Sequence, residues 1–121
     1  MFHRTAAIIV LLGLGSLTSV SQAAEKSPTA RLAHGRQIAE NVCSACHVIG
    51  ANQEFAPLLN PPAPAFADIA GRPDSTRAAL RHFVLTTHWD EKTLPLRMPN
   101  PSLTDSQVDD VLGYLLSLRK P

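Results

Sequence analysis

The chain contains two cysteines, Cys43 and Cys46, and the second is followed directly by His47. Two thiols and an imidazole at this spacing fit four kinds of chemistry: a structural disulfide, a thiol redox pair, part of a zinc site, or covalent attachment of haem. A disulfide that closes so short a loop restrains the unfolded chain little, so it would add little stability. A thiol redox pair needs a strand–loop–helix setting, and a zinc site needs four ligands.

The rest of the sequence favours haem attachment among these four. No alternating strand pattern of useful length occurs, so the setting of a thiol redox pair is missing. His34, His82 and His88 do not form the paired motif that would complete a zinc site, and we expect them at the surface or near helix ends. In haem attachment the two thiols form thioethers with the vinyl groups, and His47 is placed to ligate the iron. The pattern therefore predicts a covalently bound haem c.

A haem that transfers electrons usually has a second axial ligand, and methionine is a common one. Apart from Met1, the chain has one methionine, Met98, in the stretch Leu96-Arg97-Met98-Pro99. A single methionine can also fill a gap in a core, but such a residue is more often found on a helix face. Met98 lies in a proline-rich loop instead, so we expect it to ligate the iron together with His47.

The N-terminal segment, residues 1–23, has the layout of a secretory signal peptide. Arg4 gives a short positive region, Ala6–Leu17 is apolar, and Ser21 and Ala23 place small residues where a signal peptidase reads them. The apolar run is too short for a comfortable membrane span, although an uncleaved anchor is the alternative. We expect cleavage after Ala23 or Ala24 and export to the periplasm.

The remaining residues, 24–121, are enough for one domain. Removal of the segment 1–23 takes away Arg4 and leaves ten basic and ten acidic side chains, so the formal charge of the mature chain is zero. This balance gives no electrostatic case for binding nucleic acid or an anionic membrane surface. Aromatic residues make up only 5 % of the chain, and so short a chain has little material for a purely protein core. We therefore expect a ligand to fill part of the interior.

Apolar residues at helical spacing predict an all-α domain with three main helices. The expected helices are, in order, residues 30–42, a short one over Phe66–Ala70, one from a cap at Asp74 or Ser75 to about Thr87, and one that follows a Thr104–Gln107 capping box. Residues 52–64 and 88–101 are rich in proline and form two long loops. Loops of this length in a small domain are explained if both pack on a large apolar ligand.

The helical patterns also predict which side chains are buried. The middle helix is expected to bury Ala78, Leu80, Phe83, Val84 and Leu85. The last helix is expected to expose Asp105, Asp109 and Asp110 to solvent, and to end on Arg119 and Lys120, whose charge suits the helix dipole.

With these features the chain resembles the small class I cytochromes c of the bacterial periplasmic kind. The resemblance spans about Leu32 to Leu118 and rests on the helix that ends in Cys43–His47, the Met98-Pro99 loop and the stretch Val111–Leu115 of the last helix. It implies the cytochrome c fold, with three main helices and long loops around a haem. It also implies that the first and last helices cross at Gly35 and Tyr114. Ala39 stands where the family has an aromatic residue.

The resemblance further implies a loop proline whose carbonyl accepts the second ring N–H of His47, which orients the ring and tunes the iron. Pro64 is the candidate, and Pro57 and Pro62 are the alternatives.

In function, the chain is expected to be a soluble, monomeric periplasmic electron carrier and not an enzyme. The iron would cycle between Fe(II) and Fe(III) while His47 and Met98 stay bound. Electrons would cross at the haem edge near the thioethers, where a dehydrogenase, reductase or oxidase would dock briefly through a small interface. No stable membrane insertion is expected. The alternatives are a cytochrome subunit dedicated to a periplasmic dehydrogenase, or a gas-binding sensor or peroxidase-like protein with an open iron site.

Overall fold

The computed structural model describes residues 26–86 and 98–120, so the expected signal peptide and most of the second proline-rich loop lie outside the described residues. The described residues form four helices and no strand. The helices are α1 (Pro28–Val42), α2 (Phe66–Gly71), α3 (Arg77–Thr86) and α4 (Asp105–Ser117). The predicted all-α fold class is confirmed. No helix within the described ranges is long and apolar enough to span a bilayer.

Local capping decides where the helices begin. The side chain of Ser27 accepts a hydrogen bond from the amide of Ala30, and Pro28 occupies the first turn of α1, where its missing N–H costs nothing. This cap starts α1 two residues earlier than predicted. The predicted capping box of Thr104 and Gln107 opens α4. Thr76, rather than Asp74 or Ser75, accepts a hydrogen bond from the first turn of α3.

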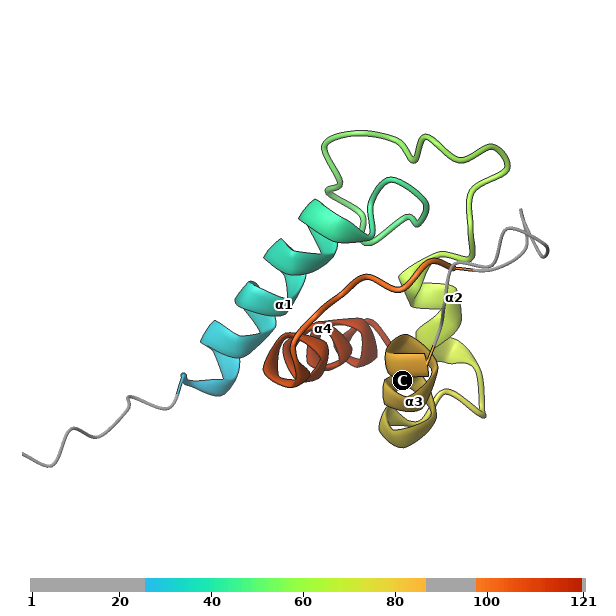
Figure 1. Cartoon of the computed structure of the whole chain (residues 1–121). Coiled ribbons are helices and arrows are strands. Elements are labelled where there is room, and N and C mark those ends of the chain that lie inside the picture. Colours follow the sequence, from blue (N-terminus) through green and yellow to red (C-terminus); the bar gives the residue numbers. More distant parts are fainter. Residues whose placement is uncertain (1–25, 87–97, 121) are drawn as a thin grey trace, which may run out of the picture.

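The centre of the fold is the crossing of α1 and α4 (Figure 1), with α2 and α3 packed on α4 as well. A Cβ atom at Gly35 would overlap the backbone carbonyl of Asp110 and lie 3.0 Å from the amide nitrogen of Val111. Glycine is therefore required for the two backbones to approach. The predicted contact of Gly35 was Tyr114, but Gly35 meets α4 one turn earlier, at Asp110. Ala39 is fully buried in the core beside this crossing, where its small side chain replaces the family's aromatic residue.

The prediction that Asp110 lies on a solvated face is wrong. Its side chain is only 7 % exposed, and it accepts hydrogen bonds from Nε of Arg31 and Nδ1 of His34, both at 2.8 Å. Burial alone would raise the pKa of Asp110, but the hydrogen bonds and the charges of Arg31 and His34 together outweigh burial and lower it. Asp110 therefore ties α4 to the N-terminal half of α1.

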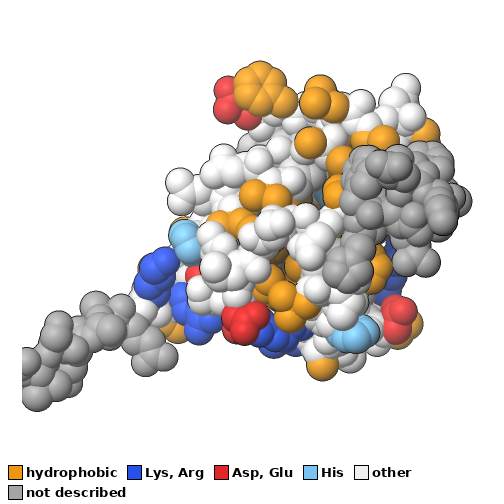
Figure 2. Space-filling model, viewed as in Figure 1, with side chains coloured by type: hydrophobic (Ala, Val, Ile, Leu, Met, Phe, Trp, Pro, Cys, Tyr) orange, Lys and Arg blue, Asp and Glu red, His pale blue; other side chains and the backbone are white. Residues whose placement is uncertain are grey.

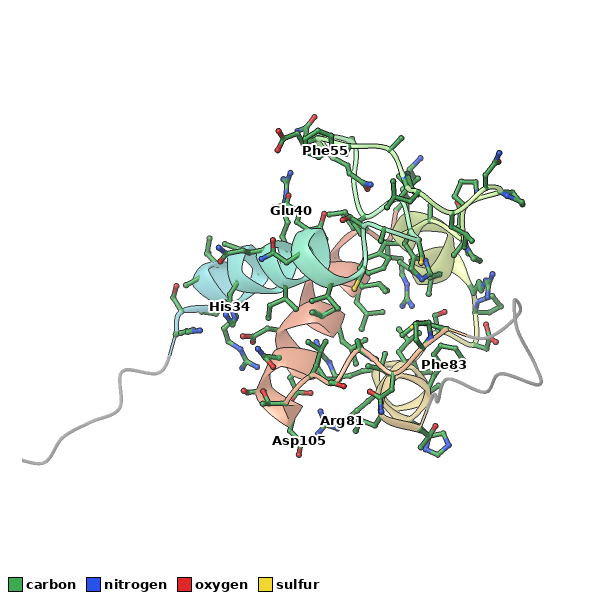
Figure 3. The ribbon with its side chains drawn as sticks, turned by 45° about the horizontal axis from the view of Figure 1, so that its top comes forward. His34, Glu40, Phe55, Arg81, Phe83 and Asp105 are labelled. Carbon is green, nitrogen blue, oxygen red and sulfur yellow. The ribbon has the colours of Figure 1, made fainter. Side chains whose placement is uncertain are left out.

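The prediction that α3 has a buried apolar face is also wrong. In the described part of the chain α3 has no buried residue, and Phe83 and Leu85 are 54 % and 38 % exposed. Leu80 packs against the core, and the polar side of the helix is held by Arg81, which pairs with Asp105 and Asp109 of α4 at 3.1 and 2.8 Å. Figure 3 shows Arg81 and Asp105 side by side, and in Figure 2 the charged side chains lie mostly over this lower part of the molecule.

Arg119 does not act as a helix-end charge, because α4 ends at Ser117. Its guanidinium donates to the carbonyls of Ala70 at 2.7 Å and Ser75 at 2.8 Å. Arg119 therefore fixes the linker between α2 and α3 to the end of α4.

Candidate functional site

A cavity of about 430 Å³ lies between the end of α1, α2, α3 and α4. This volume is within the range of cofactor sites, which is roughly 300–1,000 Å³. The lining residues are mostly apolar and include Phe66 of α2, Leu80 and Val84 of α3, and Leu112 of α4. Three of the five residues expected on the buried face of α3, Leu80, Phe83 and Val84, thus line this cavity.

Every residue predicted to bind the cofactor lines this one cavity. These residues are Cys43, Cys46, His47, Pro64 and Met98. Met98 lies 51 positions after His47 in the sequence, so the fold is what brings the two potential iron ligands to a shared space.

The turn that follows α1 presents the two thiols and the imidazole. The amide of Cys43 still donates to the carbonyl of Ala39 at 2.9 Å, and the amide of His47 donates to the carbonyl of Cys43 at the same distance. Because both bonds span four residues, the backbone keeps a helix-like pitch through the motif. This pitch explains how Cys43, Cys46 and His47 can all face the same cavity.

His47 is oriented by the carbonyl oxygen of Pro64, which lies 2.7 Å from its Nδ1. A carbonyl can only accept, so Nδ1 carries the proton and Nε2 is left as the ligating nitrogen. Backbone bonds hold the loop on both sides: Ala63 donates to Cys46 and Phe66 donates to Val48, each at 2.9 Å. Of the three prolines considered from sequence, Pro64 is the one placed against the ring.

A row of aromatic rings connects His47 to the core, and sequence reasoning did not find it. The ring of Phe66 lies 5.7 Å from that of His47 and 6.5 Å from that of Tyr114, centroid to centroid. The Tyr114 hydroxyl donates to the carbonyl of Ile49 at 2.9 Å, and burial raises the pKa of Tyr114. Gly50 is the one residue in the sequence that reflects this packing, because a Cβ there would lie 2.6 Å from the Tyr114 hydroxyl.

The cavity has a polar side that sequence reasoning also missed. Arg72, Asp74 and Ser75 line it from the linker between α2 and α3, the segment that Arg119 fixes. No local pattern distinguishes these residues from an ordinary solvated loop. Arg72 offers a cation and Ser75 a hydroxyl to the carboxylates of a large apolar group, whereas the carboxylate of Asp74 opposes such charges.

The Cys43 thiol does not have the surroundings of a reactive thiol. Cys43 and Cys46 are not joined by a disulfide in the structure. Burial, with a smaller contribution from Cys46, raises the pKa of the Cys43 thiol to about 11, whereas reactive thiols have a lowered pKa. Within residues 26–86 and 98–120, no three His, Cys, Asp or Glu side chains gather to hold a metal ion. The apolar cavity with two thiols, an oriented imidazole and a thioether therefore fits a haem with covalent links.

Comparison with known proteins agrees with a covalently bound haem c. The family model described as Cytochrome c matches residues 32–119, a range that contains all five predicted site residues. The chain is also 29 % identical over 109 residues to a protein named Cytochrome c-552 from Bradyrhizobium diazoefficiens, an alignment that covers 90 % of this chain and 95 % of that protein. No solved structure matches the chain at the same level of significance.

Proposed function

Because the chain belongs to the cytochrome c family, we propose that it is an exported electron carrier with His47 and Met98 as the two axial ligands of one haem c. Membership of the family itself implies a covalently bound haem c, electron transfer as the function, and a redox partner. When bound, the haem supplies an iron that alternates between Fe(II) and Fe(III).

One observation supports the ligand assignment above all others: His47 and Met98 line the same cavity as the two thiols. Cys43 and Cys46 would form the thioether links. The Pro64 carbonyl keeps the proton on Nδ1 of His47, so the same nitrogen stays available in both oxidation states. Pro99 and Pro101 follow Met98 and line the cavity as well; their fixed φ angles limit how far the backbone after Met98 can move.

The proposed ligation is tested by spectroscopy of the ferric and ferrous holoprotein. We expect the weak charge-transfer band of a sulfur–Fe(III) bond at the red end of the visible spectrum, and no binding of CO to the reduced protein. Met98→Ala should remove the band, allow CO to bind and lower the reduction potential, because a methionine ligand raises it. Leu103→Ala, which changes another residue that lines the cavity, should keep the band.

Absence of the band in the unmodified protein, together with ready CO binding, would instead assign an open iron site and contradict the proposal. A stable complex with a dehydrogenase on purification would assign the chain as a dedicated subunit.

Export to the periplasm, action as a monomer and the lack of an enzymatic activity of its own complete the proposal. The signal layout of the segment 1–23 supports export. Intact-mass measurement of the purified holoprotein tests it, because the mature chain should begin at Ala24 or Glu25. A mass that still includes the segment 1–23 would show that it is an uncleaved anchor.

A further inference from the structure

The loop that follows the haem motif exposes its largest apolar side chains. Phe55 and Leu58 are 73 % and 88 % exposed, the highest values among the large apolar residues in the described part of the chain, and Leu59 is 41 % exposed. We call Phe55, Leu58 and Leu59 the loop face. Figure 3 shows Phe55 standing away from the helices, so it does not contribute to the core. Exposed apolar groups that cluster in this way mark interaction sites.

The loop face is anchored to the haem motif by its backbone. The amides of Leu58 and Leu59 both donate to the carbonyl of Ala45, at 2.9 and 3.2 Å. The side chain of Gln53 braces the loop, because it accepts from the amide of Ile49 at 2.7 Å and donates to the carbonyl of Phe55 at 2.6 Å. Ala45 lies between the two thiols. A protein that covers the loop face therefore comes within a few residues of both covalent links.

The surroundings of the loop face carry almost no charge. Between residues 42 and 67 the sequence has a single charged side chain, Glu54, if His47 is neutral. The nearest ion pair on α1, between Arg36 and Glu40 at 2.8 Å, is neutral as a unit. In Figure 2 the top of the molecule shows apolar groups beside one acidic group, in contrast to the charged lower part. Apart from Glu54, a charged partner surface would lose its hydration here without gaining an opposite charge.

From these three observations we propose that the redox partner docks on the loop face and presents an apolar, uncharged surface of its own. The inference rests on the proposed carrier function and adds the chemistry of the partner. Association of this kind has no electrostatic steering, so its rate does not depend on salt. It is also brief, because a face of three apolar side chains buries little area.

The holoprotein itself supplies a probe with the required surface, because a second copy presents the same loop face. Electron self-exchange between ferrous and ferric copies can be measured from the broadening of the haem methyl signals by NMR. We expect a rate that stays within about twofold between about 0.01 M and 1 M ionic strength, over which the Debye length falls from about 30 to 3 Å.

Leu58→Lys and Leu85→Lys form a matched pair of variants with the same added charge. Leu85 is exposed on α3 and does not line the cavity. Leu58→Lys places two cations face to face, so self-exchange should fall about tenfold at low salt and recover at high salt to the rate of Leu58→Ser, because salt screens only the repulsion. Leu85→Lys should change the rate less than twofold. Leu58→Ser should lower the rate severalfold without salt dependence, whereas Leu85→Ser should not.

Equal effects of the two lysine variants, a strongly salt-dependent rate of the unmodified protein, or self-exchange too slow to measure would each overturn the inference. A stable dimer in sedimentation would assign the loop face to a second copy and overturn it as well. The charge-transfer band and reduction potential are recorded on the same samples. If these are as proposed while the rates are not, only the docking inference fails; if the band is absent from the unmodified protein, the proposed ligation fails separately.

Discussion

At the scale of single residues, the position of His47 depends on contacts that reach the far helix. Its ring packs on Phe66, which packs on Tyr114, and the Tyr114 hydroxyl binds the Ile49 carbonyl. Ile49 is 1 % exposed, so its carbonyl has little access to water if this hydrogen bond is lost. The hydroxyl of Tyr114 thus links α4 to the segment that directly follows the haem motif.

Tyr114→Phe should lower the free energy of unfolding by about 1–2 kcal/mol, because it leaves a buried carbonyl unpaired. Gly50→Ala should cost about 1–3 kcal/mol through overpacking, since its Cβ would lie 2.6 Å from the Tyr114 hydroxyl. In the Tyr114→Phe background this clash is absent, so Gly50→Ala should cost about 1 kcal/mol less. Denaturant unfolding of the four proteins measures the coupling. Strictly additive costs would contradict the contact.

At the scale of elements, the crossing of α1 and α4 depends on Gly35. Gly35→Ala places a Cβ into the backbone of α4, and backbone atoms cannot yield as a flexible side chain can, so we expect a loss of about 3 kcal/mol or more. Gly113→Ala on α4 is the matched control. Its Cβ would make an ordinary contact of 3.6 Å with Leu32, so better helix propensity should leave stability unchanged or raise it by up to about 1 kcal/mol. Thermal unfolding of both variants decides between these outcomes.

Asp110 makes the same crossing sensitive to acid. Its pKa is lower in the folded state than in the unfolded chain, so its contribution is complete above the unfolded pKa of about 3.9 and is lost as the pH falls through the folded pKa. Asp110→Asn should cost about 1–2 kcal/mol at pH 7, a modest value because Arg31 and His34 are partly exposed. Urea unfolding at a series of pH values should show this difference shrinking below about pH 4. A difference that is constant down to pH 2 would contradict the role of the charge.

Elements that depend on neighbours in sequence were predictable, and features that depend on distant partners were not. The Thr104–Gln107 box and the cysteine–histidine spacing are local, so they gave the start of α4 and the motif on the cavity. Asp110 was misjudged because its partners Arg31 and His34 are 79 and 76 positions away. Of the five apolar residues expected on the buried face of α3, only Leu80, Phe83 and Val84 line the cavity, because periodicity does not distinguish a cavity from a protein core.

At the scale of the whole molecule, the described residues provide only a small protein core. Ten hydrophobic residues are buried, among them Ile38, Ile49 and Leu112, and all lie outside α3. The apolar side of α3 lines the cavity instead. The haem that the family binds is therefore part of the core, and the helices depend on it unequally: α1 and α4 pack mainly on each other, whereas α3 relies on the cavity and on the ion pairs of Arg81.

The unequal dependence of the helices on the haem predicts how the chain behaves when the covalent links are removed. The double variant Cys43→Ala/Cys46→Ala, purified free of haem, should lose hydrogen-exchange protection first in α3, because exposed ion pairs contribute at most about 1 kcal/mol each. Amides of α1 and α4 near Gly35 should remain the most protected, because their backbones touch and their side chains form the core. Haem added back without covalent links should restore protection in α3, since His47 is unchanged. Equal loss of protection in all helices would mean that the crossing of α1 and α4 is not stable without the haem, and that the haem stabilises α1 and α4 as directly as it does α3.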